Sequence, residues 1–169
     1  MTAASFDPTA YKRNTRDQWY ESGAGYAAWG DTVQSIIRPA AEHMMDTIGL
    51  QVGNSVLVLA CGGGALTLML TERVGEEGDV LATDLSPGMV ALAKANLDRA
   101  GWSQVEVREM DGEVLDIGDR RFDRVCRASH SCSAPIPDPV GCRSSLSRAT
   151  FPGLRRGSQD SAPGNLGGR

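Results

Sequence analysis

The stretch that decides the fold reads Ser55-Val56-Leu57-Val58-Leu59-Ala60-Cys61-Gly62-Gly63-Gly64. A short apolar run rich in Val and Leu is typical of a buried parallel strand, and the glycines at its end allow a tight turn into a helix. A second apolar strand follows at Asp79-Val80-Leu81-Ala82-Thr83 and closes on Asp84. Because parallel strands end at the same edge of a sheet, Asp84 is expected beside the glycine turn. A helix N-terminus next to a carboxylate suits a nucleotide. The N–H groups of the helix would face the ligand, and the carboxylate would accept hydrogen bonds from the ribose hydroxyls.

Each of these residues also has a purely structural interpretation. Glycines after a strand often only make a turn, and an aspartate at a strand end is usually a helix cap. Ser86 is predicted to cap the next helix, which leaves Asp84 available for ribose. The dinucleotide pattern G-x-G-x-x-G is met only in part, since Gly62 and Gly64 fit but the third place is Thr67.

The order of strand, A-C-G-x-G turn, helix, strand, acid, Ser-Pro and helix resembles the class I S-adenosylmethionine-dependent methyltransferases. Within that family the chain looks most like the small-molecule branch that includes the ubiquinone and menaquinone methyltransferases, and the resemblance covers Tyr26 to Arg127. It implies an α/β fold, a Rossmann-like, doubly wound, mostly parallel sheet with helices on both faces, incomplete at its C-terminal side. It also implies S-adenosylmethionine as cofactor and a small-molecule acceptor that is methylated on carbon or oxygen.

The resemblance places the cofactor on both motifs and on a third turn. There Asp111 would accept a hydrogen bond from the adenine amino group, with backbone contacts from Gly112 or Glu113, although Asp111 could simply stabilise its own turn. Met89 is interpreted first as a core residue and second as an adenine contact. The expected cofactor-binding residues are Ala60, Cys61, Gly62, Gly63, Gly64, Asp84, Leu85, Met89, Asp111, Gly112 and Glu113.

By the same resemblance, the acceptor pocket is expected from the N-terminal segment, with Tyr20, Tyr26 and Trp29 as candidates, and from residues after the fourth strand. A sulfonium is already activated, so the protein needs mainly to hold the acceptor in line with the methyl group. A base is needed only where the acceptor must lose a proton, and no catalytic residue is assigned. No metal is expected, and His43 is interpreted as a surface or packing residue.

Val58 departs from the family pattern. The family usually has an acid at this place, which helps to organise the glycine turn and faces the cationic end of the cofactor. A wholly apolar strand folds well, so Val58 is expected to pack in the core. The missing acid is expected to weaken the affinity for the cofactor. Losing a charge-assisted hydrogen bond typically costs about 1.5–3 kcal/mol, or roughly ten- to a hundredfold in affinity, unless another acid compensates.

The composition sets the outer limits. The chain has 169 residues and a formal net charge of −4, which suits one domain and argues against a nucleic-acid partner. No apolar run is long enough to span a membrane, no signal peptide is apparent, and the four cysteines show neither C-x-x-C spacing nor a disulfide framework. We therefore expect a cytoplasmic address without membrane insertion, and leave the oligomeric state open.

Three regions are expected along the chain. Residues 1–30 form an N-terminal segment of short helices over the site, residues 31–127 form the cofactor-binding core, and residues 128–169 form an irregular tail. Apolar spacing predicts a helix from Val33 to Ile48 with a kink at Pro39, and a helix from Pro87 to Ala100. Further strands are predicted over 105–108 and 121–126.

The composition changes near residue 126. Residues 1–125 hold 11 Lys and Arg against 19 Asp and Glu, whereas residues 126–169 hold 6 Arg against 2 Asp. The tail is rich in Ser, Pro and Gly, and its apolar residues follow neither a strand nor a helix period. We hypothesise that the chain is truncated or frame-shifted after about residue 126. The alternatives to an active methyltransferase are then a catalytically inactive cofactor-binding fragment or, less in keeping with Thr67, an NAD-dependent oxidoreductase.

Translation of the coding DNA in its other two frames tests the frame-shift hypothesis. We expect one of them to give a helix followed by an apolar strand downstream of the codon for Val125. If neither frame does so, the hypothesis fails.

Overall fold

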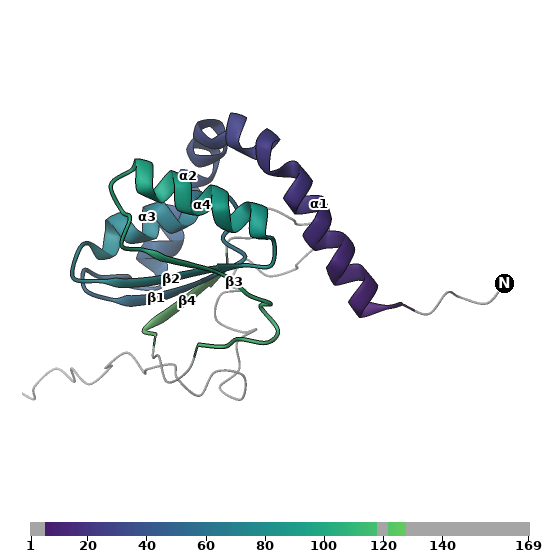
Figure 1. Ribbon diagram of the computed structural model, residues 1–169. Coiled ribbons are helices and arrows are strands. Elements are labelled where there is room, and N and C mark those ends of the chain that lie inside the picture. Colours follow the sequence, from purple (N-terminus) through teal and green to yellow (C-terminus); the bar gives the residue numbers. More distant parts are fainter. Residues whose placement is uncertain (1–5, 118–121, 128–169) are drawn as a thin grey trace, which may run out of the picture.

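Helices and strands alternate along the chain, as the sequence predicts. The computed structural model describes residues 6–117 and 122–127, so the expected tail at 128–169 lies outside the described residues. Figure 1 shows the elements, which are α1 (Pro8–Ala28), α2 (Gly30–Thr47), β1 (Ser55–Leu59), α3 (Ala65–Val74), β2 (Asp79–Asp84), α4 (Pro87–Arg99), β3 (Glu106–Glu109) and β4 (Arg124–Arg127).

β1 lies inside a parallel sheet whose order is β3-β2-β1-β4. Val56 of β1 lies opposite Val80 on one side and Arg124 on the other. β2 and β3 are added in turn on one side of β1, and β4 is added on its other side. The strand order therefore reverses at β1. Open α/β sheets bind ligands at the carboxyl edge beside such a reversal, and the glycine turn follows β1 directly. This architecture confirms the expected parallel, Rossmann-like α/β fold, although in the described part of the chain the helices that pack on the core cover one face of the sheet.

The core forms on both sides of β1. Val56 and Val58 face one side and Leu57 and Leu59 the other, as the period of a strand requires, and all four are buried. α2, α3 and α4 cover the first side (Figure 1) and contribute, among others, Met45, Leu70, Val74 and Ala93. In the described part of the chain, the second side is covered by Leu115, Ile117 and Phe122.

The N-terminal region differs from the prediction of short helices, because α1 is one continuous helix. Asp7 starts it, since its Oδ1 accepts hydrogen bonds from the backbone N–H groups of Thr9 (2.9 Å) and Ala10 (3.1 Å). α2 likewise continues through Pro39 to Thr47, so the predicted kink does not break it.

Two further local predictions were inaccurate. β3 and β4 each have four residues, Glu106–Glu109 and Arg124–Arg127, and they begin later than predicted because pairing with β2 and β1 fixes their ends. Ser86 does stand at the N-cap position of α4, but its hydroxyl makes no capping hydrogen bond. The missing cap matters for the site described below.

Ala60 has a backbone conformation that glycine would adopt more easily. Among the described residues it is the non-glycine residue with a positive φ, at 52°. An L-residue in the left-handed region costs about 1–2 kcal/mol because its Cβ approaches the following carbonyl oxygen. The first residue of the glycine turn is therefore strained.

We expect Ala60→Gly to raise the free energy of unfolding by about 0.5–1 kcal/mol, because relief of strain exceeds the added chain entropy of glycine. Urea denaturation would measure the change. Ala95→Gly, at an exposed helical position of α4, is the matched control and should lower stability by about 1 kcal/mol. A loss of stability in both variants would contradict the strain at Ala60.

Candidate functional site

The Asp84 carboxylate joins the two turns at the carboxyl edge of the sheet. Its Oδ2 accepts a hydrogen bond from the Gly62 N–H (2.8 Å), and its Oδ1 accepts one from the Ser86 N–H (2.9 Å). Each carboxylate oxygen has two lone pairs, so both oxygens keep capacity for a further donor. The structure thus fixes a half-buried carboxylate beside the glycine turn, as the sequence predicts.

The glycine turn is held by backbone hydrogen bonds and by one side chain. The Cys61 N–H donates to the Thr83 carbonyl (2.9 Å), and the Gly64 N–H donates to the Cys61 carbonyl (3.0 Å). From α4, the Asn96 amide donates to the Gly63 carbonyl (2.8 Å). Val58 is fully buried in the core, so it contributes packing and no charge. The turn is therefore ordered without an acid at position 58.

The glycine turn has one open side and one packed side. A Cβ at Gly62 would meet nothing within 4 Å, whereas one at Gly64 would lie 3.1 Å from the Cα of Ala93. Gly64 thus packs against α4, and Gly62 faces open space beside Asp84. Among the described residues no side chain caps α3, so the first N–H groups of that helix stay available to a ligand.

Ser86 supplies a second observation in favour of a ligand. Its Oγ is buried and has no hydrogen-bond partner in the described part of the chain. A buried hydroxyl without a partner is costly, and here it lies one residue beyond Leu85 and two beyond Asp84.

The third predicted turn is also present, but Asp111 already has partners. Its Oδ1 accepts from the Glu113 N–H (2.9 Å), which is the turn-stabilising role. Its Oδ2 accepts from Lys12 Nζ (2.6 Å), and Lys12 also pairs with Glu113 (2.6 Å). Lys12, followed by the Glu113 N–H, holds the pKa of Asp111 below its usual range. A Cβ at Gly112 would meet nothing within 4 Å, so this turn too borders open space.

α1 crosses the carboxyl edge of the sheet from β3 to the glycine turn (Figure 1). In the middle of α1, Arg16 pairs with Glu109 at the end of β3 (2.6 Å). Further along, a Cβ at Gly88 would lie 3.1 Å from the Cα of Tyr20, so glycine is needed where α1 meets α4. No residue of α1 is buried, and the helix is held largely by these contacts.

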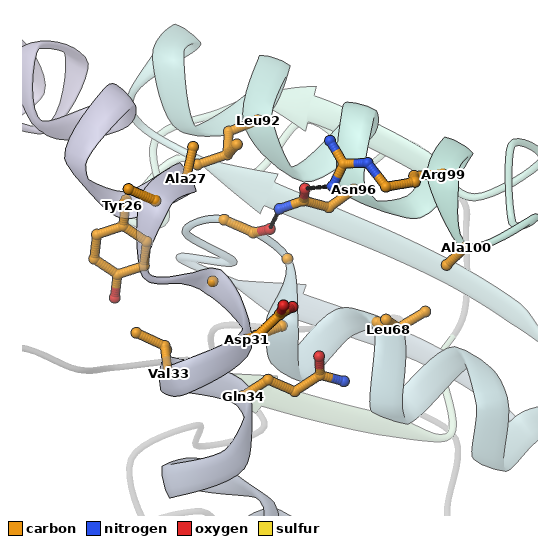
Figure 2. Close-up of a pocket in the computed structure, with 15 residues that line it drawn as sticks. Tyr26, Ala27, Asp31, Val33, Gln34, Leu68, Leu92, Asn96, Arg99 and Ala100 are labelled. Atoms are coloured by element: carbon orange, nitrogen blue, oxygen red, sulfur yellow. Dashed lines mark hydrogen bonds between the residues drawn. The ribbon is translucent and has the colours of Figure 1, made fainter.

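The three aromatic pocket candidates take different positions. Tyr26 lies close to Gly63, where an added Cβ would be 3.4 Å from the Tyr26 ring, and its ring packs edge-on against Trp19. Tyr20 and Trp29 are 62% and 65% exposed. Figure 2 shows a pocket that Tyr26 lines; neither Tyr20 nor Trp29 lines it. Of the remaining candidates, Met89 is buried in α4, as expected for a core residue.

Two ionisable groups near the site stay protonated at neutral pH. Burial, and to a lesser extent the charge of Asp84, raises the pKa of Cys61 to about 12. Burial and the same carboxylate also raise the pKa of Tyr26 above its usual value. The Cys61 thiol is therefore no nucleophile, and the Tyr26 hydroxyl is a hydrogen-bond donor and not a phenolate base.

Three residues at the site were not found from the sequence. Lys12 and Arg16 come one helical turn apart on α1, and Asn96 lies on α4. The Asp7-Pro8 pair is a recognisable helix start, and from it the common face of Lys12 and Arg16 could have been predicted. No local signal connects Asn96 with the glycine turn.

Comparison with known proteins agrees with this geometry. Residues 56–153, more than half of the chain, match the family described as a methyltransferase domain. The chain belongs to the class I S-adenosylmethionine-dependent methyltransferase family. S-adenosylmethionine is the cofactor of this family, as the sequence predicts. The match begins in β1 and continues past the described residues to position 153.

Several relatives of this methyltransferase domain are known. The chain is 29% identical to an aklanonic acid methyltransferase of Streptomyces sp. over 79% of this chain and 58% of the relative. It is 38% identical to a ubiquinone/menaquinone biosynthesis C-methyltransferase of Azotobacter vinelandii over 66% of this chain and 45% of the relative. The chain thus spans about half the length of the curated relatives it matches.

A solved structure supports the fold. A protein from Methanococcus maripaludis, assigned as an S-adenosyl-L-methionine-dependent methyltransferase, superposes with a TM-score of 0.56 at 18% identity and covers 75% of this chain and 53% of that one. Within residues 6–117 and 122–127, no helix has the length and apolar character of a membrane span. The same residues contain no cluster of potential metal ligands.

We expect Lys12→Met to raise the pKa of Asp111 toward that of an ordinary aspartate, because the cation that stabilises its charged form is removed. NMR titration of the carboxyl carbon would measure this. In the unchanged protein, the Lys12–Asp111 ion pair stabilises the fold at pH values above the ordinary pKa of an aspartate. This stabilisation is lost as the pH falls through the lowered pKa of Asp111. Because amide exchange is intrinsically slower in acid, the quantity to follow is the protection factor of the amides in α1, which should fall as the pH drops through that range.

Arg13→Met, an exposed position on the same helix, is the control and should change neither the Asp111 pKa nor the exchange rates. An unchanged pKa in Lys12→Met would show that the ion pair does not form in solution.

Proposed function

We propose that this chain binds S-adenosylmethionine at the carboxyl edge of β1 and β2 and serves methyl transfer to a small organic acceptor. The observation that carries the proposal is the Asp84 carboxylate, which two backbone N–H groups fix beside the open side of Gly62. Family membership supports the cofactor. The names of the two relatives support a small-molecule acceptor.

Each element of the site has a defined part in this proposal. Asp84 accepts hydrogen bonds from the ribose hydroxyls through the lone pairs that the Gly62 and Ser86 N–H groups leave free. The unbonded N–H groups at the start of α3 face the charged end of the cofactor. The bound cofactor supplies an activated methyl group, so the protein contributes orientation and exclusion of water.

Two other functions share part of this geometry. An NAD-dependent oxidoreductase would also use a glycine turn and an acid, but Thr67 is fully buried in α3 where the dinucleotide pattern has glycine. A cofactor-binding fragment without activity would keep the whole site. Binding of S-adenosylmethionine without turnover on any acceptor would identify the fragment.

We expect Asp84→Asn to weaken binding of S-adenosylmethionine by roughly ten- to a hundredfold, because charge-assisted hydrogen bonds to ribose are lost. Isothermal titration calorimetry would measure the affinity, with thermal denaturation to show that the glycine turn still folds. Asp98→Asn, an exposed residue of α4, is the matched control.

NAD serves as the competing ligand in the same assay. Stabilisation of the unchanged protein by NAD and not by S-adenosylmethionine would contradict the proposal, since only a ligand bound by the folded state raises the unfolding temperature. If the Asp84→Asn and Asp98→Asn variants bind S-adenosylmethionine with equal affinity, Asp84 does not contact the cofactor.

A further inference from the structure

The glycine turn is fixed by groups outside it, because its own residues have no side chains. Gly62, Gly63 and Gly64 follow one another, and glycine loses more conformational freedom on folding than any other residue. Asp84 holds Gly62, and Gly64 packs against α4. Gly63 is held by the side chain of Asn96 on α4, whose Nδ2 lies 2.8 Å from the Gly63 carbonyl oxygen. A change in α4 can therefore reach the middle of the turn.

The hydrogen bond from Asn96 completes the fixation of the peptide between Gly63 and Gly64. The carbonyl of this peptide accepts from Asn96, and its N–H donates to the Cys61 carbonyl (3.0 Å). The peptide lies between the Gly62 N–H, which belongs to the ribose side of the proposed site, and the first N–H groups of α3. Its orientation therefore sets how these two parts of the site stand relative to each other.

Arg99 in turn orients the amide of Asn96. Its guanidinium donates to Asn96 Oδ1 (2.9 Å) from three residues further along α4, and Figure 2 shows both hydrogen bonds of the amide. A guanidinium only donates and a carbonyl oxygen only accepts. The amide thus satisfies both neighbours in one orientation, with Oδ1 toward Arg99 and Nδ2 toward Gly63. Rotated by half a turn, it would present an acceptor to the Gly63 carbonyl and donors to the guanidinium.

We infer that Arg99 is a positioning residue of the proposed cofactor site, which acts through Asn96 on the glycine turn. Its role there rests on the proposed function. Without Arg99 the amide of Asn96 rotates more freely, and the Gly63–Gly64 peptide loses part of its fixation. Ordering of the turn then adds to the free energy that binding must supply. The effect is modest, because Arg99 is exposed and water partly replaces its hydrogen bond.

Two other roles of Arg99 predict different results. As a cation in the last turn of α4, it would stabilise the helix through the helix dipole and leave the glycine turn unchanged. As a residue that lines the pocket of Figure 2, it would contact a bound ligand directly, and that contact would persist after removal of Asn96. A double-mutant cycle on Asn96 and Arg99 separates these roles.

Calorimetric titration of the full chain with S-adenosylmethionine provides the cycle. We expect Asn96→Ala to weaken binding about tenfold and Arg99→Met about threefold, each within the range of one hydrogen bond. The double variant should bind no more weakly than Asn96→Ala alone, because Arg99 acts through Asn96. A further loss from Arg99→Met in the Asn96→Ala background would overturn the inference, and so would full affinity of the single Arg99→Met variant.

Two controls match the Arg99→Met variant. Arg99→Lys keeps a cation that only donates, within reach of Asn96 Oδ1, and should bind within a factor of about two of the parent. Lys94→Met removes an exposed cation from the same helix and should leave the affinity unchanged. A loss in either control equal to that in Arg99→Met would overturn the inference.

A measurement without ligand separates this inference from the proposed function. In amide NMR spectra, the Gly64 signal should shift and lose protection from hydrogen exchange in Arg99→Met and in Asn96→Ala, but not in Lys94→Met. An unchanged Gly64 amide in Arg99→Met would overturn the inference. If the Gly64 amide responds as expected but the parent does not bind S-adenosylmethionine, the proposed function fails together with the role of Arg99 in binding, and the coupling of Arg99 to the glycine turn stands.

Discussion

The carboxylate of Asp84 is the constraint on which the rest of the site depends. It is the only side chain among the described residues that accepts hydrogen bonds from both the β1–α3 turn and the β2–α4 turn, through Gly62 and Ser86. Two parallel strands with neighbouring carboxyl ends would otherwise leave these turns independent of one another. With both fixed to one carboxylate, the open side of Gly62 and the start of the β2–α4 turn keep a set position relative to one another. Binding residues from separate elements are thus preorganised before a ligand is present.

α1 lies across the carboxyl edge of the sheet and is held there by interactions that differ from those of the core. The sheet and its helices are held by buried apolar side chains, whereas α1 has none and relies on Lys12, Arg16 and a close approach to Gly88. Exposed ion pairs contribute little and are weakened by salt. α1 is therefore the least firmly held of the described helices, and it is the one that crosses the proposed cofactor site. A cover of this kind can admit a ligand without any disturbance of the sheet.

Local sequence patterns were sufficient to predict the alternating elements and the placement of Asp84 beside the glycine turn. Val and Leu runs, the glycine turn, and the Asp84 position each depend on a few neighbouring residues. The N-terminal region was only partly predicted, since α1 is one helix whose partners Glu109 and Asp111 lie far along the chain. The hydroxyl of Ser86 does not cap α4, because the Ser86 backbone is bound to Asp84 and its side chain is buried. Nothing local in Ala60 indicates its positive φ, which the turn around it imposes.

The hydrogen bonds of the glycine turn explain how the chain keeps its shape with Val58 in place of an acid. Thr83, Asp84 and Asn96 each fix one residue of the turn, and single hydrogen bonds of this kind contribute about 0.5–1.5 kcal/mol net. Together they replace the organising role of the missing acid, but they do not replace its charge. Under the proposed function, recognition therefore shifts toward the ribose end of the cofactor, where Asp84 supplies a fixed negative charge.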